Sequence, residues 1–465
     1  MAGTWSLPLI DRDEPRFAEA SREMIERGDY VVPHFNNQLR LDKPPLSYWA
    51  QVASFKFFGT SDFAARFPSA IAAALAALMI FAWTSRIEGK KIAWWAAIIF
   101  TLSLQTFIHA KAAVADMWLV FFVTLAHWSG YELLEANETL NAQRSTLNAQ
   151  RKWWFMFYIS LALGFLAKGP IAWTPLLAIA SMKFIAPDRP LAHRFKFVRG
   201  IVLMLVIVSL WGVPALIQTH GEFFQVGLVH HVVERSFSTM EGHGAKSFAM
   251  YLLLLPLYFV TVFASFFPWS IKLPELAKKM WQQRDWIDNY LIAAAAIIFL
   301  IFTFVKTKLP HYTLPAFPML AVLMARHWPR EKGKLFNRIA VATACAWLGT
   351  ALIAPPLVAG KFPAYAMFQQ SRDLLRPEME FGAIEYNEPS LVWYFRSRIK
   401  GFFTPLGKKN VAEFMEKSGP HLVIVPTEVS VPLLANHPNW KTFSVRGFNL
   451  AKGKQVELTL MLKAE

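Results

Sequence analysis

The chain has 465 residues, of which 55% are hydrophobic and 15% aromatic, and its net charge is +16. This composition is too apolar for one soluble core of that length, so it predicts a polytopic membrane protein and argues against a soluble enzyme. The charge does not indicate nucleic-acid binding, because Lys and Arg lie in short clusters between apolar segments, as the positive-inside rule expects. The single cysteine, Cys345, excludes disulfides and cysteine-rich metal sites within one chain.

The N-terminal part of the chain is polar and contains two segments with helical periodicity. Residues 13–28 combine apolar positions at helical spacing with charged residues such as Glu19 elsewhere, which predicts an amphipathic helix on a membrane surface. A second surface helix, rich in aromatic residues, is expected over residues 45–58 and ends at Gly59. We therefore interpret residues 1–61 as an outer loop with interfacial helices.

Apolar stretches of roughly membrane-spanning length follow this loop. Because each can cross the hydrocarbon layer as a helix, the sequence predicts about ten spans, which form a transmembrane core over residues 62–358. The stretches lie near residues 64–85, 92–109, 113–134, 153–167, 171–185, 200–217, 248–271, 291–305, 312–325 and 339–358.

The loops between these stretches alternate in charge. One set is rich in Lys and Arg and is expected on the cytoplasmic side, whereas the opposite set carries few cations. Because the charge bias disfavours cations outside, each one kept there is expected to have a local role. The outer cations are Lys111, Lys168, Arg235, Lys246, Lys306 and Lys308. They share the outer side with Asp13, Asp42 and Lys43, so the candidate chemistry gathers on one face, the periplasmic face in a Gram-negative cell.

An even number of spans places both chain ends outside, yet no signal peptide or spanning segment precedes Asp13. We therefore expect either that an N-terminal membrane helix is missing from this chain or that its topology is set by its first helical hairpin. After residue 358 the composition becomes mixed, and residues 391–395, 421–425 and 456–461 are typical of strands. These strands predict a small outer-face α/β domain over residues 359–465.

Three residues early in the chain could carry chemistry. Asp13 is either the N-cap of a helix or a catalytic base. Lys43 is followed by two prolines that fix the backbone and aim the side chain, although a lysine that reaches up to the membrane interface is the alternative. Asp116 lies near the outer end of a predicted helix, where a carboxylate is costly unless it is paired or functional.

Further cations follow at breaks between apolar segments. Lys168, in a Lys-Gly-Pro turn, is either a phosphate ligand or part of a plain hairpin loop. Arg235 has the planar fork that suits phosphate oxygens. The run from Lys306 to Tyr312 offers cations and a phenol, or a simple interfacial anchor. A divalent metal held by Asp42 with His230 or His231 is a weaker hypothesis, because no pair has the spacing of a zinc motif.

In order along the chain, these motifs resemble those of the GT-C class of glycosyltransferases, which use lipid-linked sugars. The similarity is strongest to bacterial enzymes related to the 4-amino-4-deoxy-L-arabinose transferase of lipid A, and more distant to protein O-mannosyltransferases. The motifs are residues 13–19 (DEPRFAE), 28–30 (GDY), 42–45 (DKPP), 63–69 (FAARFPS), 115–116 (AD), 167–170 (AKGP) and 306–312 (KTKLPHY).

The resemblance implies that Asp13 is the catalytic carboxylate, with Glu14 beside it and Asp116 as a second acidic partner. It also implies a divalent metal ion near Asp42 and His230. The residues implied to hold the donor phosphate are Lys43, Lys168, Arg235, Tyr312, Arg16 and Lys308. The chain departs from the family pattern in the missing first helix, in Pro-Arg-Phe where Ala-Arg-Tyr is usual, and in a shorter C-terminal part.

Together these features predict an inverting glycosyltransferase of the bacterial inner membrane. It would move a sugar from a polyprenyl (undecaprenyl) phosphate to a lipid, glycan or protein acceptor at the periplasmic face, as in lipopolysaccharide modification. No glycine-rich phosphate loop is apparent, which fits a lipid donor rather than a nucleotide. The alternatives are a transporter or flippase, which predicts charged or broken helices at the membrane midplane and internal repeats, and an inactive donor-binding accessory protein.

Overall fold

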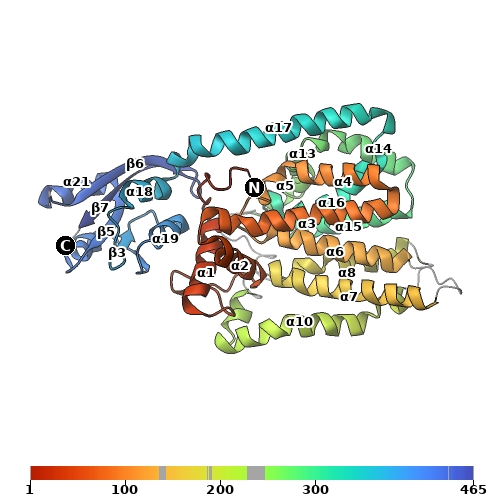
Figure 1. The fold of residues 1–465 in the computed structure, drawn as a ribbon, viewed down its shortest axis with the longest axis horizontal. Helices are drawn as coiled ribbons and strands as arrows, with labels where there is room; N and C mark the ends of the chain where they lie inside the picture. Colours follow the sequence, from red (N-terminus) through yellow and green to blue (C-terminus); the bar gives the residue numbers. More distant parts are fainter. Residues whose placement is uncertain are drawn as a thin grey trace. The chain divides into compact units, whose positions relative to one another are not determined.

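The structure, a computed structural model, describes residues 2–135, 143–185, 187, 191–227, 247–437 and 439–463. The chain forms two compact units (Figure 1). The terminal unit comprises Met1–Arg40, Tyr48–Phe67 and Leu348–Glu465, so it joins both ends of the chain. The helical unit comprises Leu41–Ser47 and Pro68–Trp347.

The N-terminal part of the terminal unit contains the first predicted surface helix, as α1 (Asp13–Arg27). Gly28 ends α1 in the left-handed conformation, with φ 67°. A short antiparallel hairpin follows, made by β1 (His34–Phe35) and β2 (Gln38–Leu39). Its turn is Asn36-Asn37, whose φ values of 53° and 63° suit asparagine better than most residues. The second predicted helix is α2 (Leu46–Phe58), after which Gly59 again takes a positive φ.

The C-terminal part of the terminal unit is an α/β fold around a five-stranded sheet of order β4-β3-β5-β7-β6. β3 pairs in parallel with β4 and β5, whereas β7 pairs antiparallel with β5 and β6. The strands are β3 (Glu380–Ala383), β4 (Phe403–Pro405), β5 (His421–Pro426), β6 (Lys441–Asn449) and β7 (Lys454–Lys463). The accompanying helices are α18 (Pro363–Ser371), α19 (Pro389–Phe395), α20 (Val411–Glu416) and α21 (Thr427–Asn436).

The strand predictions for this part were correct in two places and wrong in one. Residues 421–425 and 456–461 lie in β5 and β7. Residues 391–395 form most of the helix α19, which begins at Pro389. All seven residues of α19 are buried, so the segment is apolar without alternation, and such a short run does not distinguish strand from helix. Proline in the first turn is the feature that favours the helix.

Each predicted apolar stretch lies on helical segments, and the segments wholly within the helical unit follow in chain order. They are α4 (Lys90–Leu102), α5 (Leu104–His109), α6 (Asp116–Glu135), α7 (Gln143–Lys168), η1 (Pro170–Trp173), α8 (Thr174–Ile185), α9 (Leu191–Phe195), α10 (Phe197–Gln218), α12 (Phe248–Leu253), α13 (Leu257–Ser265), η3 (Trp269–Lys272), α14 (Leu273–Gln282), α15 (Trp286–Phe304), η4 (Pro310–Ala316), α16 (Phe317–His327) and η5 (Arg330–Lys332). α3 (Asp62–Glu88) and α17 (Gly333–Val358) each contribute residues to both units. One continuous hydrophobic core, which includes Trp83, Tyr258 and Trp269, fills the interior of the helical unit.

Four helical segments among the described residues are long and apolar enough to cross a membrane. They are Asp62–Glu88, Leu191–Gln218, Trp286–Phe304 and Gly333–Lys361. Within Leu191–Gln218, large apolar side chains such as Val198, Leu210 and Ile217 are exposed, and only 22% of the most apolar window is buried. A surface this apolar is expected to face lipid rather than water.

One ion-pair cluster of the helical unit joins three helix ends. Arg326, near the end of α16, lies 2.8 Å from Glu88 of α3 and 2.7 Å from Asp285, the N-cap of α15. Asp285 and Asp288 form a capping box at the start of α15, and Arg326 also pairs with Asp288. These charges are satisfied by one another and by helix ends, so they fix helix packing rather than offer free groups.

Candidate functional site

A cavity of about 700 Å³ lies within the helical unit. Most of its lining is apolar, with Phe165, Trp173 and Trp211 among the larger side chains. Thr174 and Ser209 add hydroxyl groups to the lining, while its charged, histidine and tyrosine part comes from loops and helix ends and consists of Asp42, Lys43, Asp116, Lys168, His311 and Tyr312. Five of these six residues were predicted as site residues from the sequence, so the structure brings together candidates from four separate segments of the chain.

An ion pair joins two residues of this lining, the buried Asp116 and the partly buried Lys168. Asp116 is the first residue of α6, and Lys168 is the last residue of α7, where Gly169 takes φ 81° and ends the helix. The Lys168 Nζ lies 2.6 Å from Oδ1 of Asp116, and the two side chains are only 16% and 10% exposed. The Asp116 carboxylate is therefore paired, as the cost of a carboxylate at this depth requires, and the phosphate-ligand role of Lys168 stays a prediction.

His311 and Tyr312 extend this cluster from η4. The Nε2 atom of His311 lies 3.9 Å from Oδ1 of Asp116. The Lys168 Nζ lies 5.8 Å from the centre of the Tyr312 ring, which packs on Phe302 with ring centroids 4.7 Å apart. His311 lies within the motif of residues 306–312, but it was not predicted as a site residue. Proximity to Asp116, which only folding creates, is the signal that identifies it.

Lys43 and Asp42 form a second charged pair in the cavity lining. The Lys43 Nζ lies 3.2 Å from the Asp42 carbonyl oxygen and 3.8 Å from its carboxylate Oδ2. Both side chains are partly exposed, at 19% and 25%. Lys43 thus keeps a neutralising partner while its ammonium remains accessible from the cavity, as a ligand-binding lysine requires.

Lys308 has a local structural partner at the end of α15. Its ammonium donates hydrogen bonds to the carbonyl oxygens of Phe302, at 2.8 Å, and Thr303, at 2.5 Å. These are carbonyls that the helix itself leaves unpaired. Burial lowers the pKa of Lys308 to about 8. Lys308 therefore closes a helix end, and it is absent from the cavity lining.

Asp13, Glu14 and Arg16 lie in the terminal unit. Asp13 is exposed in the first turn of α1, and the N-cap of that helix is Arg12 with no side-chain cap, so the N-cap alternative for Asp13 is wrong. Glu14 is buried and accepts two hydrogen bonds from Arg66, at 2.9 and 2.7 Å. This bidentate pair fixes the start of α1.

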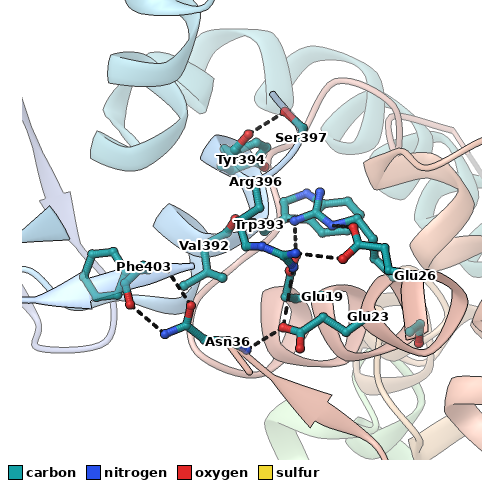
Figure 2. A network of polar contacts seen from close by, with 12 residues as sticks. Glu19, Glu23, Glu26, Asn36, Val392, Trp393, Tyr394, Arg396, Ser397 and Phe403 are labelled. Atoms are coloured by element: carbon teal, nitrogen blue, oxygen red, sulfur yellow. Dashed lines mark hydrogen bonds and ion pairs between the residues drawn. The ribbon is translucent and has the colours of Figure 1, made fainter. Parts of the chain in front are cut away.

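The charged side of α1 was expected to face water, and the structure buries much of it. Glu19 and Glu23 are fully buried rather than facing water. Figure 2 shows Arg396, the C-cap of α19, reaching the acidic residues of α1, with a 2.7 Å bond to Glu26 and a bond to Glu19. Arg22 also bonds to Glu19. The charged side of α1 is therefore buried against residues from the far end of the sequence rather than facing water, and the interfacial location of this helix stays a prediction.

This network also involves the hairpin and an aromatic ring. Glu23 accepts a hydrogen bond from the backbone N–H of Asn37 at 3.1 Å, and the side chain of Asn36 donates to the Phe403 carbonyl at 2.9 Å. The Arg22 guanidinium lies 4.8 Å from the centre of the Trp393 ring. Burial raises the pKa of Glu19 to about 7, and the charges of Arg22 and Arg396 oppose that rise.

Two predicted site residues, Arg235 and His230, lie outside the described residues, as do His231 and Lys246. The phosphate-binding role of Arg235 and the metal-binding role of His230 stay predictions.

Comparison with known proteins adds an independent line of evidence. Residues 9–230 match the family described as dolichyl-phosphate-mannose-protein mannosyltransferase. The chain is 30% identical over 330 residues to the undecaprenyl phosphate-alpha-4-amino-4-deoxy-L-arabinose arabinosyl transferase of Edwardsiella ictaluri, which covers 70% of this chain and 56% of that protein. The corresponding protein of Aeromonas hydrophila is 29% identical over 323 residues, with 68% of this chain and 56% of that protein covered. The chain thus spans little more than half the length of these relatives.

Solved structures show the same fold. ArnT from Cupriavidus metallidurans, described as bound to undecaprenyl phosphate, superposes with a TM-score of 0.79 at 19% identity, over 99% of this chain and 95% of that one. The archaeal oligosaccharyltransferase AglB from Archaeoglobus fulgidus gives a TM-score of 0.52 at 12% identity, over 98% and 71%. The resemblance predicted from the motifs is confirmed: the chain is similar to the ArnT arabinosyl transferases and the protein mannosyltransferases, and it has the fold of a GT-C glycosyltransferase.

Proposed function

We propose that this chain transfers a sugar from a polyprenyl phosphate, with inversion at the anomeric carbon, to a lipid, glycan or protein acceptor. The observation that carries the proposal is the cavity of the helical unit, which combines apolar walls with Lys43, Lys168 and Tyr312. A lipid phosphate needs both parts, because apolar walls accommodate its chain and cations hold its head. The undecaprenyl phosphate named for ArnT of Cupriavidus metallidurans supports this donor class.

The two cavity lysines would act on the leaving phosphate. Negative charge on the phosphate grows as the bond to the sugar breaks, so a nearby ammonium stabilises the transition state more than the ground state. Lys168 is paired with Asp116, and a phosphate would share or replace that partner. The Tyr312 hydroxyl can donate a further hydrogen bond to a phosphate oxygen. Arg16 and Arg235 are proposed as additional phosphate ligands on the strength of the motif resemblance, whereas Lys308 is assigned the helix-closing role that its bonds to the Phe302 and Thr303 carbonyl oxygens support.

Asp13 is proposed as the carboxylate that accepts the proton of the acceptor hydroxyl as its oxygen attacks. Two facts support this role: Asp13 matches the family motif, and its side chain is exposed and not used as a helix cap. Glu14, which pairs with Arg66, would contribute by holding the same turn. Asp116 would serve as the second acidic group through its control of Lys168.

The resemblance also implies a divalent ion at Asp42 and His230. Asp42 lines the cavity, and its carboxylate oxygens suit a hard or borderline cation. Such an ion would stabilise phosphate charge when bound. Asp42 would then hold the ion next to Lys43, which reaches the same carboxylate.

We also propose the wider arrangement expected from the sequence. The chain would have about ten spans in a bacterial inner membrane, with residues 1–61 and the α/β part after residue 358 on the periplasmic side. Its products would include modified lipid A or related lipopolysaccharide. The alternation of loop charge supports this topology.

A transfer assay tests the proposal. Purified protein would be given radiolabelled undecaprenyl phosphate sugars, including 4-amino-4-deoxy-L-arabinose, together with lipid A and a membrane extract. We expect transfer by the wild type, at least about a hundredfold loss in Asp13→Asn and Lys43→Ala, and no loss in Lys183→Ala, whose side chain is exposed on α8.

Equal transfer by the wild type and both site variants would remove Asp13 and Lys43 from the mechanism. Folded wild-type protein that transfers nothing across the donor panel, and instead moves the lipid phosphate between membrane leaflets, would favour the flippase alternative.

A further inference from the structure

His109, Asp116 and His311 converge in the helical unit from three different segments. His109 is the last residue of α5, Asp116 the first residue of α6, and His311 the second residue of η4. Their potential ligand atoms all lie within 4.8 Å of one another. We propose that these three side chains form a binding site for a single transition-metal ion of the Zn²⁺ class, separate from the pair Asp42 and His230.

The distances are close to those that a bound ion requires. Ligands about 2.1 Å from a tetrahedral ion lie about 3.4 Å from each other. The present separations of up to 4.8 Å therefore need only small side-chain rotations to close. The His109 and His311 rings already lie close together, with centroids 5.0 Å apart and ring planes tilted by 39°.

The surroundings of His109 favour a metal-binding tautomer. Its Nδ1 lies 3.2 Å from the carbonyl oxygen of Gln105, one helical turn earlier, and 2.9 Å from the Gln105 side-chain amide. A backbone carbonyl that accepts a hydrogen bond from Nδ1–H leaves the lone pair on Nε2, which is the usual arrangement behind a metal-binding histidine. The amide, whose oxygen and nitrogen are interchangeable by a flip, can support the same tautomer.

The chemistry of the three ligands selects the ion. Two imidazoles and one carboxylate suit Zn²⁺ and similar borderline ions, whereas Mg²⁺ and Ca²⁺ prefer oxygen ligands only. Asp116 and His311 line the cavity, so three protein ligands would leave a coordination position facing it. A site open in this way would bind an exchangeable fourth ligand such as water or a phosphate oxygen.

Lys168 allows a test in which a substitution is expected to strengthen metal binding rather than weaken it. Its ammonium lies 2.6 Å from Oδ1 of Asp116, so it competes with a metal ion for that carboxylate and repels the ion's charge. Replacing Lys168 by methionine should therefore tighten metal binding, by about tenfold or more, although the same change should weaken binding of a phosphate. A site that did not use Asp116 would show no such gain.

The test is direct metal binding by the full chain in detergent, after removal of the purification tag and treatment with a chelator. Co²⁺ would be titrated first, because its visible absorption reports coordination, and Zn²⁺ binding would follow by calorimetry. We expect one ion per chain, and at least tenfold weaker binding in His109→Ala and His311→Ala. His193→Ala is the matched control, since His193 is exposed on α9.

Asp116→Asn leaves Lys168 without its partner and can fail to fold, so the two histidine variants and Lys168→Met decide the outcome. Absence of binding by the wild type, or equal binding by His109→Ala and His311→Ala, would overturn the proposal. Binding that persists in these variants and disappears in Asp42→Asn or His230→Ala would place the ion elsewhere. Because metal binding is measured without any transfer, failure here leaves the proposed transferase function to its own assay.

Discussion

The terminal unit and the cavity of the helical unit both hold charged side chains, and they satisfy them in different ways. In the terminal unit, Glu19 is fully buried and bonds to both Arg22 and Arg396, so its carboxylate is enclosed by protein donors (Figure 2). In the helical unit, Lys168 has one carboxylate partner and lines a cavity of about 700 Å³. The closed network is suited to holding elements together, whereas the open pair keeps the capacity to bind a charged ligand.

The closed network and the cavity also use different cationic residues, in agreement with their different roles. Arginine dominates the closed network, because its planar fork can satisfy two carboxylates at fixed geometry. Arg396 does so by reaching Glu19 and Glu26. Lysine dominates the cavity, where Lys43 and Lys168 are compact charges on flexible stems. A lysine can leave its carboxylate for a phosphate at little geometric cost, and an arginine in a network of several bonds cannot.

The largest expected effect comes from breaking the closed network. Arg396→Met removes bonds to Glu19 and Glu26 and leaves carboxylates buried with fewer partners. It should lower the free energy of unfolding by about 3–5 kcal/mol. The measurement is denaturant unfolding in detergent, followed by tryptophan fluorescence. Arg398→Met is the control, because Arg398 is exposed two residues later. If both variants unfolded alike, the network would not hold the unit together.

A second effect concerns pH and Asp11. The Asp11 carboxylate accepts hydrogen bonds from the backbone N–H of Ser390, at 2.8 Å, and from its hydroxyl. Burial nevertheless raises the pKa of Asp11 from 3.8 to about 7. The folded state therefore binds the Asp11 proton more tightly than the unfolded state does. The stability that protonated Asp11 contributes is complete below pH 3.8 and is lost as pH rises to about 7.

Replacing Asp11 by asparagine should remove this contribution, which we expect to be about 1–3 kcal/mol. Thermal unfolding between pH 5 and about 8 would compare the wild type with Asp11→Asn. The wild type should lose stability with rising pH more steeply than the variant. Parallel pH profiles would contradict the assignment to Asp11.

The smallest expected effect tests whether Lys308 closes a helix end or binds the phosphate. Lys308→Met removes hydrogen bonds to the Phe302 and Thr303 carbonyls and should cost about 1 kcal/mol of stability. Because Lys308 does not line the cavity, affinity for undecaprenyl phosphate should change by less than about threefold, equal to under 0.7 kcal/mol. A much larger loss of affinity with unchanged stability would restore Lys308 as a phosphate ligand.

The sequence carried enough information for the helices and for much of the cavity. Apolar stretches located the helices because burial in lipid demands continuous apolar length, and the scarcity of outer cations singled out Lys168, which indeed meets Asp116. The polar side of α1 was misjudged because Arg396, its partner, lies hundreds of positions later and no local pattern records the pairing. The role of His311 was missed for the same reason, since only folding brings η4 beside Asp116.

The central claim is that the cavity of the helical unit binds the phosphate of a lipid donor. Its most direct test is the affinity of the protein in nanodiscs for undecaprenyl phosphate. The variants are Lys168→Met combined with Asp116→Asn, which removes the cation without leaving an unpaired carboxylate, and Lys183→Ala as control. We predict that the double variant binds at least tenfold more weakly, a loss of about 1.4 kcal/mol or more, and that the control binds like the wild type. Equal affinity in all three proteins would contradict the claim.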